Sequence, residues 1–490
     1  MSKQPHTAVI GAGIGGLTTA ALLLKAGHQV TVLEAHVYPG GCAGTFFHKG
    51  YRFDAGATLA GGFAHGGPHA RVAAALDLQW PVRAADPAWS VHLPDGRVVT
   101  QWSDPERWRA ERQKHFPDTE RFWRTQELLA DISWDVSSRP FPWPPQSLAD
   151  YITLARAVRP STLRALPYIG RTIGDIAPND DPLFGAFLDG QLLISAQTTA
   201  VGANALYGSA ALDLPRRGVN HVRGGIGSLA QTLVGWIKEH GGQVLYRQQV
   251  EQIKRLPDKH FLIQTKKKLE IEADRLVANV TPWALADLLG YEVPGSLRRE
   301  LGQRQATWGA FTLYLGLDRA ALPEMSTGHH QVIVDAHKPL GEGNSVFISL
   351  ADPLDSSRAP KGKIPATLST HTAVAPWWEL VKNGRRGYLS QRAEYADRLL
   401  AAAEIALPGI GSAIDLCLPG TPATFNFYTR RPQGMVGGFP QTSLFNARGP
   451  QTGIANLWLV GDSIFPGQST AGVTLGAMRV AADVLHMSPN

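Results

Sequence analysis

Cysteine is scarce in this sequence, and its scarcity argues against several kinds of protein. Of the 490 residues only two are cysteines, Cys42 and Cys417. They lie too far apart to form a metal-binding motif, and a secreted protein of this length usually carries more of them. The sequence therefore argues against a disulfide-stabilised protein and favours the cytoplasm.

Long apolar runs are missing as well. No stretch approaches the roughly 18 apolar residues of a membrane-spanning helix, and the apolar run near the N-terminus continues into the glycines of a folded motif. We therefore expect a protein that is soluble or lies on a membrane surface.

Charge of one sign is not concentrated in any segment. The chain has 47 Lys and Arg against 41 Asp and Glu, a net charge of +6, and the cations are scattered. Because nucleic-acid binding usually needs a basic tract, no nucleic-acid partner is expected. The hydrophobic share of 44% and the length of 490 residues predict two closely packed domains.

The N-terminal residues are typical of a dinucleotide-binding unit. A short apolar strand at 7–10 runs into a glycine-rich turn and a helix, and a second strand ends at Glu34. The glycines at the GxGxxG positions are Gly11, Gly13 and Gly16. They permit a tight turn and bring a pyrophosphate close to a helix N-terminus, whose N–H groups and dipole favour anions. Glu34 would accept hydrogen bonds from the ribose hydroxyls and repel the extra phosphate of NADP, which leaves NAD and FAD open.

A second glycine cluster follows Glu34. Its backbone amides would meet the same pyrophosphate from the other side, at Gly40, Gly41, Gly44 and Thr45. The GxGxxG turn, the glutamate and the trailing Gly-Gly resemble the N-terminal signature of the FAD-binding superfamily of amine oxidases, protoporphyrinogen oxidase and phytoene desaturases. Many of those enzymes carry an arginine where this chain has Cys42, which leaves open whether Cys42 contacts the flavin or only fills space.

The C-terminal segment favours FAD over NAD. Residues 456–462 predict a buried strand that delivers Gly461 and Asp462 to a loop, and residues 472–484 have helical spacing. The resemblance implies that the Gly-Asp pair contacts the flavin's phosphate and ribityl chain. It also implies that the next helix, beginning with Gly472 and Val473, faces the isoalloxazine, where its dipole would stabilise a reduced anionic flavin. An adenine contact is implied at Val250.

The middle of the chain supplies further elements of the nucleotide-binding part. The apolar pattern predicts a helix at 229–237, strand structure at 243–253 and a core strand at 274–280. A run of lysines marks a hairpin tip between strands 260–265 and 269–273.

The predicted fold class is α/β, with a Rossmann-type FAD-binding domain of the amine oxidase and phytoene desaturase type and an inserted α+β substrate domain. We assign residues 1–72, 215–290 and 440–490 to a discontinuous FAD-binding domain. Residues 73–214 and 291–439 would form the substrate domain, which would also meet the membrane.

Several segments resemble the carotenoid desaturases of bacteria. Residues 50–58 and 467–473 resemble that branch, and residues 105–108 and 159–163 are most similar to carotenoid 3,4-desaturases, also called 3',4'-desaturases. The resemblance implies removal of two hydrogens from neighbouring carbons of an acyclic or monocyclic carotenoid, with or without a 1-hydroxyl. Electrons would pass from FAD to an acceptor such as oxygen or a quinone. The alternatives are a carotenoid cis-trans isomerase, another phytoene- or lycopene-type desaturase, a carotenoid or retinoid saturase, and a non-catalytic prenyl carrier of the same fold.

Candidates for acid–base chemistry come from two places. His65 and His69 are predicted in a loop just past the flavin-proximal turn, where either could carry a proton near neutral pH. Arg430 completes the candidate catalytic set, and Tyr428 and Arg431 are its neighbours; all three would suit recognition of a substrate hydroxyl. The alternative for each is an ordinary solvated side chain. No catalytic metal is expected, because ligand spacing is missing.

The segment 141–171 suits contact with lipid. Aromatic and aliphatic residues are interleaved there with arginines, a pattern typical of an interfacial membrane helix. Prolines within the segment predict several short helices rather than one long one. The alternative is a substrate-domain helix whose apolar face is simply core.

Overall fold

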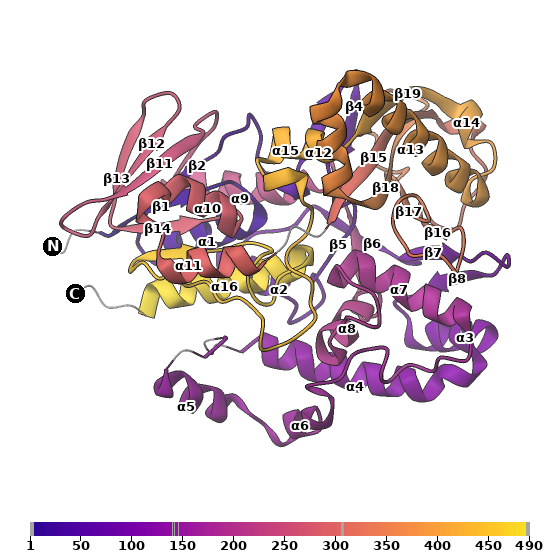
Figure 1. The fold of residues 1–490 in the computed structure, drawn as a ribbon, viewed down its shortest axis with the longest axis horizontal. Coiled ribbons are helices and arrows are strands. Elements are labelled where there is room, and N and C mark those ends of the chain that lie inside the picture. Colours follow the sequence, from indigo (N-terminus) through magenta and orange to yellow (C-terminus); the bar gives the residue numbers. More distant parts are fainter. Residues whose placement is uncertain (1–3, 140, 142, 146, 305–307, 487–490) are drawn as a thin grey trace.

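The computed structural model describes residues 4–486 apart from 140, 142, 146 and 305–307. Two lobes lie side by side, both described chain ends belong to the same lobe, and a layer of helices lies below (Figure 1). Each lobe is filled by its own large cluster of buried apolar side chains. The chain therefore forms a nucleotide-binding type of lobe and a second lobe built on a different sheet.

A five-stranded parallel sheet forms the centre of the first lobe, in the order β10-β2-β1-β14-β20. Its strands are β1 (His6–Ile10), β2 (Gln29–Leu33), β10 (Gln243–Leu245), β14 (Arg275–Ala278) and β20 (Leu457–Leu459). These strands come from three distant parts of the chain, yet all run the same way. Their carboxyl ends therefore meet at one edge of the sheet, where α/β proteins bind ligands.

Three helices pack on this sheet: α1 (Ile14–Lys25), α9 (Gly227–Glu239) and α16 (Ser469–His486). α1 contacts both of the other helices, and the residues of its first turn are buried. The predicted strand at 7–10 and the helix at 229–237 are confirmed. The C-terminal helix begins three residues before the predicted 472.

The predicted strand structure at 243–253 divides between two sheets. Residues 243–245 join the parallel sheet as β10, whereas β11 (Val250–Arg255) starts a separate antiparallel sheet with β12 (Phe261–Thr265) and β13 (Glu270–Ala273). The predicted hairpin tip is confirmed, because Lys268 has a φ of 64° in the turn between β12 and β13.

The second lobe is built on a seven-stranded, mostly antiparallel sheet in the order β19-β15-β18-β17-β16-β7-β8. Its strands are β7 (Trp89–His92), β8 (Val98–Gln101), β15 (Trp308–Asp318), β16 (His329–Ile333), β17 (Ser345–Leu350), β18 (Lys363–Ala373) and β19 (Ile414–Gly420). Helices α12 (Val374–Asn383) and α13 (Arg385–Ala406) pack beside it (Figure 1). Together, the two lobes confirm the predicted α/β fold class with an inserted α+β part.

The lower layer of Figure 1 consists of helices from one continuous stretch of the chain. They are α3 (Pro105–His115), α4 (Glu120–Ser137), α5 (Leu148–Ala157), α6 (Pro160–Leu163), α7 (Pro182–Ala196) and α8 (Ala205–Leu212). The remaining strands and α-helices are short: β3 (Thr45–His48), β4 (Tyr51–Asp54), β5 (Ala60–Gly61), β6 (Val82–Ala85), β9 (Val219–Val222), α2 (Pro68–Leu76), α10 (Pro282–Leu289), α11 (Gly295–Gln303), α14 (Ile410–Ala413) and α15 (Pro422–Thr429). The segment 141–171 contains the expected short pieces, and α5 and α6 project at the edge of the molecule.

Candidate functional site

The first part of the site is the turn that follows β1. Gly11 has a φ of +93°, which only glycine adopts readily. α1 starts at Ile14, and Gly13 before it offers no side-chain cap to the helix. The first N–H groups of α1 therefore have no capping side chain, which makes this end of the helix suited to an anion.

The glycines of this turn are required by the protein's own backbone. A Cβ on Gly11 would lie 2.7 Å from the carbonyl oxygen of Asn279, and one on Gly13 would lie 2.4 Å from the Asn279 side-chain nitrogen. A Cβ on Gly16 would lie 2.4 Å from the carbonyl oxygen of Gly11. Asn279 follows β14 and supports the turn from the neighbouring strand. The sequence prediction did not single it out, although it directly follows a buried strand.

Glu34 lies at the end of β2, next to the turn. Its carboxylate accepts hydrogen bonds from the backbone N–H of Ala12 (2.8 Å) and of His36 (2.7 Å). Burial raises the pKa of this carboxyl, although the backbone donors act in the opposite direction. The acid predicted to meet a ribose is thus held rigidly at the rim of the glycine turn.

The second glycine cluster touches the first. Gly40, with a φ of +115°, donates its N–H to the carbonyl of Ala12 at 2.8 Å and forms a bridge with Gly13. Gly41 and Gly44 follow in a short 3-10 turn. Thr45 is engaged within the protein: its hydroxyl donates to Asp54 at 2.6 Å and accepts from the Gly227 N–H at 2.9 Å.

Asp54, at the end of β4, forms a buried ion pair with the second lobe and a hydrogen bond with the first. Arg358, in the loop before β18, donates to its carboxylate at 2.9 Å, and both side chains are less than 10% exposed. The backbone N–H of Ile226, just before α9, donates to the same carboxylate at 2.9 Å. Sequence reasoning missed this pair, because nothing in the local pattern around Arg358 marks a buried cation.

The C-terminal segment completes the arrangement. A Cβ on Gly15 would lie 3.2 Å from the Gly461 N–H nitrogen and 3.1 Å from a methyl of Val473, so this segment packs on the first turn of α1. Gly472 is equally confined, since a Cβ there would lie 1.8 Å from the carbonyl oxygen of Gly467. The carboxylate of Asp462 forms an ion pair with the guanidinium of Arg431 at 2.9 Å. We call residues 11–16, 40–44 and 461–462 together the cofactor cradle.

A family model for flavin containing amine oxidoreductases matches residues 14–485. The chain belongs to this family. The cofactor of this flavoprotein is therefore FAD, and the cradle fits it: crowded glycines, an uncapped helix N-terminus and an acid at the end of the second strand.

Relatives of this flavoprotein align over nearly all of its length. It is 28% identical over 515 residues to the chloroplastic prolycopene isomerase of Daucus carota, and the alignment covers 99% of this chain and 81% of the isomerase. It is 25% identical over 514 residues to the lycopene-forming phytoene desaturase of a Paracoccus species, with 97% and 96% covered. A solved oxidoreductase from Methanosarcina mazei has the same fold, with a TM-score of 0.66 at 19% identity, covering 97% of this chain and all of that one.

The predicted catalytic residues lie in different surroundings. His69 does not lie in a loop: it belongs to the first turn of α2, is buried, and stacks on Phe63 with ring centroids 4.5 Å apart. Burial lowers its pKa to about 3, so the ring is neutral at pH 7 and is a poor proton carrier. His65 lies in an exposed turn.

The arginines and tyrosine near residue 430 have separate surroundings. Arg430 is exposed at the end of α15, with a φ of 58°, and its guanidinium lies 5.2 Å from the ring of Phe427. Tyr428 is 56% exposed. Arg431 is paired with Asp462. Val250, for which an adenine contact was implied, is buried at the start of β11.

An apolar cavity of about 360 Å³ lies between the helical layer and the C-terminal segment. At one end its lining includes Val158, Leu163 and Leu166, which are 42–58% exposed. At the other end it includes Gly467 and Gly472, which belong to the segment that packs on α1. The cavity therefore joins the molecular surface to the neighbourhood of the cofactor cradle.

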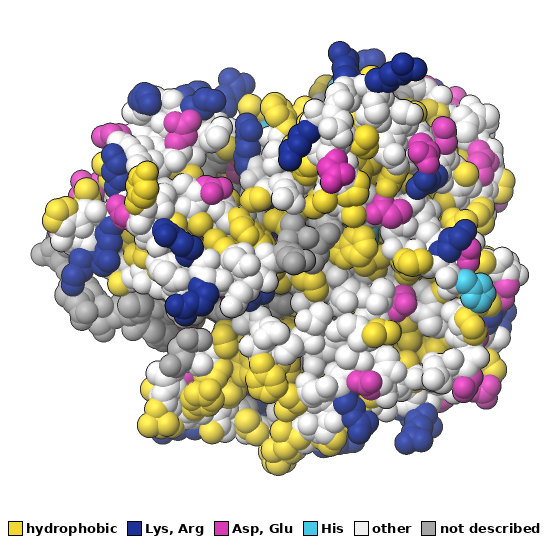
Figure 2. Space-filling model, viewed as in Figure 1, with side chains coloured by type: hydrophobic (Ala, Val, Ile, Leu, Met, Phe, Trp, Pro, Cys, Tyr) yellow, Lys and Arg dark blue, Asp and Glu magenta, His cyan; other side chains and the backbone are white. Residues whose placement is uncertain are grey.

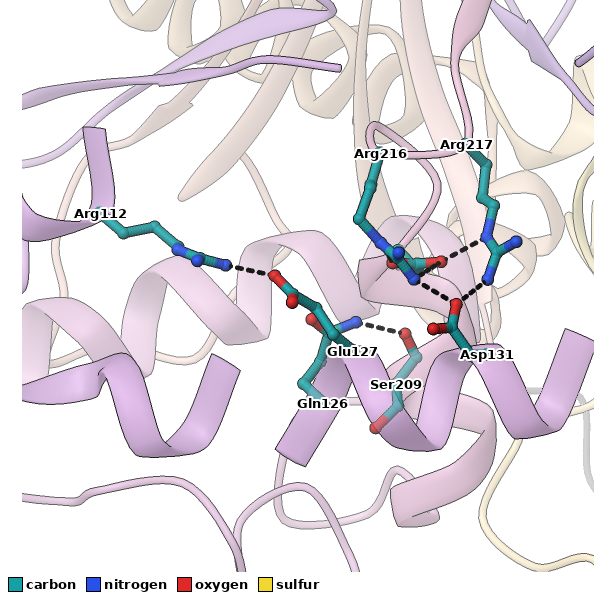
Figure 3. Close-up of polar contacts among 8 residues, drawn as sticks. Arg112, Gln126, Glu127, Asp131, Ser209, Arg216 and Arg217 are labelled. Carbon is teal, nitrogen blue, oxygen red and sulfur yellow. Dashed lines mark hydrogen bonds and ion pairs between the residues drawn. The ribbon is translucent and has the colours of Figure 1, made fainter. Parts of the chain in front are cut away.

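The inner wall of this cavity is held in place by α4. Figure 3 shows Asp131 of α4 between Arg216 and Arg217, each of which also pairs with Asp213. The Gln126 side chain donates to the carbonyl of Ser209 in α8 at 2.8 Å (Figure 3). These contacts fix α4 against α8, whose residues line the cavity from two sides.

Exposed apolar side chains surround the outer end of the cavity. They gather over α5 and α6 at the lower left of Figure 2. We call this surface the α5–α6 patch; its members, each 42–78% exposed, are Leu148, Tyr151, Ile152, Val158, Leu163 and Leu166. The nearby arginines, all exposed, are Arg156, Arg159, Arg164 and Arg171. An apolar area of this kind marks an interaction surface.

No helix in the described part of the chain is long and apolar enough to cross a membrane. Asp258, His260 and Glu272 lie close enough together to share a metal ion, on the outer three-stranded sheet. A ring nitrogen of His260 also lies 3.1 Å from a carboxylate oxygen of Asp274, so contacts among these side chains account for the cluster.

Proposed function

We propose that this flavoprotein is a carotenoid desaturase that introduces a C=C bond at C-3,4 or C-3',4' of an acyclic or monocyclic carotenoid, with or without a 1-hydroxyl. The cavity of about 360 Å³ carries the proposal, because most of its lining is apolar and it runs from an apolar surface to residues 465–475, next to the cofactor cradle in sequence. A long polyene matches that chemistry, whereas an amine would find no buried carboxylate among the residues that line it.

The cradle residues are proposed to hold FAD through its diphosphate and adenosine. Backbone N–H groups of the two glycine clusters and the N-terminus of α1 would bind the diphosphate, and Glu34 would bind the ribose. Asp462 would lie at the flavin end. When bound, FAD would supply the acceptor for a hydride from an allylic carbon, and the proton lost from the neighbouring carbon would be released to water. The polyene spreads the developing charge along its length.

The protein's own part in the reaction is mainly alignment. Because the polyene delocalises charge, little acid or base strength is needed, which agrees with the neutral, buried His69 and the exposed His65. The apolar wall made by Phe465, Leu475 and Leu206 would exclude water and hold the substrate in one register. The final electron acceptor would be oxygen or a quinone.

Cis-trans isomerisation of a carotenoid is the second candidate. The alignment with prolycopene isomerase over 99% of this chain favours it. An isomerase would need the same cavity and the same cradle, so the two activities differ in the net oxidation of the substrate rather than in the site.

The substrate would enter from a membrane surface through the α5–α6 patch. Exposed Leu163 and Leu166 beside exposed Arg164 and Arg171 present apolar side chains and cations together, as interfacial helices do. The flavoprotein would accordingly be a cytoplasmic protein that attaches peripherally to lipid.

Expression in cells that make lycopene or its 1-hydroxy derivative tests the activity. Pigments with additional conjugated double bonds, compared with an empty-vector control, would support desaturation. Geometric isomers alone would favour the isomerase, and unchanged pigment in cells that contain the FAD-loaded protein would refute both.

Flotation with vesicles tests the membrane proposal. The protein should float with phosphatidylcholine vesicles that contain phosphatidylglycerol, and Leu163→Glu with Leu166→Glu should abolish flotation. Tyr291→Glu is the control, because Tyr291 is a fully exposed aromatic residue that follows α10 in the first lobe. Equal flotation of the patch variant and the control would refute lipid docking at this surface.

A further inference from the structure

Arg431 is a buried cation at the junction of two parts of the cofactor cradle. It follows α15 and belongs to the second lobe by sequence, but its guanidinium donates to the Asp462 carboxylate at 2.9 Å. The same side chain contacts the thiol of Cys42 in the second glycine cluster. Its side chain is only 15% exposed and that of Asp462 only 22%.

The chain around Arg431 is built to keep the cation there. Its guanidinium also donates to the backbone carbonyls of Met435 (2.8 Å) and Gly437. The following residue, Gly438, is pressed against Asp462, since a Cβ there would lie 1.9 Å from the Asp462 carbonyl oxygen. Burial lowers the pKa of Arg431, but the charge of Asp462 and the Cys42 thiol outweigh it and raise the net value.

The physical need for this cation follows from the charge of FAD. Its diphosphate is doubly negative at neutral pH, and an unpaired carboxylate at the neighbouring turn would repel it in a poorly hydrated site. Cys42 does not add a further negative charge, because burial raises the pKa of its thiol. Among the described residues, Arg431 is the cation within ion-pair distance of Asp462.

We infer that Arg431 is the built-in counter-ion of the FAD site, which neutralises Asp462 and thereby allows the C-terminal turn to lie beside the anionic cofactor. The inference rests on the proposed position of Asp462 at the flavin end of the cradle. It assigns Arg431 to cofactor binding rather than to substrate recognition.

Titration of the FAD-free protein with FAD, followed by quenching of flavin fluorescence, measures the effect without any turnover. Arg431→Met should weaken FAD binding by about tenfold or more, as expected when one partner of a buried charge pair is removed. Arg431→Met combined with Asp462→Asn should bind FAD about as tightly as Asp462→Asn alone, because the carboxylate that Arg431 neutralises is absent from both. Arg386→Met, which removes an exposed cation of α13, should bind FAD like the parent protein.

Two results would overturn the inference. One is unchanged FAD affinity of Arg431→Met. The other is a double variant that binds FAD about tenfold more weakly than Asp462→Asn alone, which would mean that Arg431 acts only by shaping residues 435–437. If Arg431→Met does not fold, Arg431→Lys must bind FAD more tightly than Arg431→Gln. Arg431→Gln combined with Asp462→Asn must then bind FAD about as tightly as Asp462→Asn alone. Failure of the parent protein to bind FAD would instead refute the cofactor site itself.

Discussion

Gly16→Ala is the sharpest test of how the cofactor cradle is built. Gly16 lies in the first turn of α1, where a Cβ would stand 2.4 Å from the carbonyl oxygen of Gly11 and 2.9 Å from Cβ of Asn279. A backbone oxygen and a Cβ atom cannot rotate out of the way, so the first turn of α1 must move away from the turn that follows β1. Alanine favours a helix by about 0.5–1 kcal/mol over glycine, whereas forced overpacking costs about 1–3 kcal/mol.

Gly235→Ala provides the matched comparison. Gly235 is in the interior of α9, and a Cβ there would meet no atom within 4 Å. This variant should gain about 0.5–1 kcal/mol of unfolding free energy, while Gly16→Ala should lose about 1–2 kcal/mol on balance. Because the displaced turn carries the N-terminus of α1, FAD affinity of Gly16→Ala should also fall by about tenfold, or ~1.4 kcal/mol.

Urea unfolding of the FAD-free proteins and titration with FAD measure the two quantities separately. If Gly16→Ala is as stable as Gly235→Ala and binds FAD like the parent protein, the close approach of the β1 turn to α1 does not support the cofactor.

Three further outcomes follow from other parts of the structure. Asp54→Asn leaves the buried guanidinium of Arg358 without its carboxylate, so the unfolding free energy should fall by about 3–5 kcal/mol; an unchanged urea midpoint would contradict the role of this pair. Burial lowers the pKa of His371 to about 4, so the folded state resists the proton that the unfolded chain accepts below about pH 6.5. The stability that uncharged His371 contributes is then complete above that pH and declines toward pH 4 by about 3 kcal/mol. His371→Gln should therefore lose less stability than the parent protein between pH 7.5 and pH 5 in urea titrations; an equal loss would contradict the burial of His371. Ala210→Phe, which fills the apolar cavity, should stop carotenoid conversion while the bound-flavin spectrum persists; full conversion would show that the cavity is not the substrate path.

Local patterns predicted the elements of the first lobe well. The apolar strand β1, the GxGxxG turn and the helix α1 each depend on residues within a few positions of one another. The pattern at 243–253 did not show that this stretch divides between two sheets, because alternation of apolar residues predicts a strand but not the strand with which it pairs. Only pairing of β10 with β2 and of β11 with β12 separates the two.

The surroundings of His69 could not be predicted from the sequence. His69 follows several glycines and a proline, a composition typical of a loop, yet it starts α2 and is buried under Trp80 and Phe63. The burial of a side chain depends on what packs over it, and here Trp80 and Thr474 come from outside the local pattern.

The sequence alone determined the glycine turn, the helix start and the acid at the next strand end that are typical of a dinucleotide site, because every requirement of that turn is local. Only the tertiary structure decided how the site is completed. Parallel pairing of β1, β14 and β20 brings Gly11, Asn279 and Gly461 to one edge of the sheet, and the loop after α15 brings Arg431 to Asp462. Those contacts join residues more than 400 positions apart in one case and from different lobes in the other, so packing, rather than any local signal, places them.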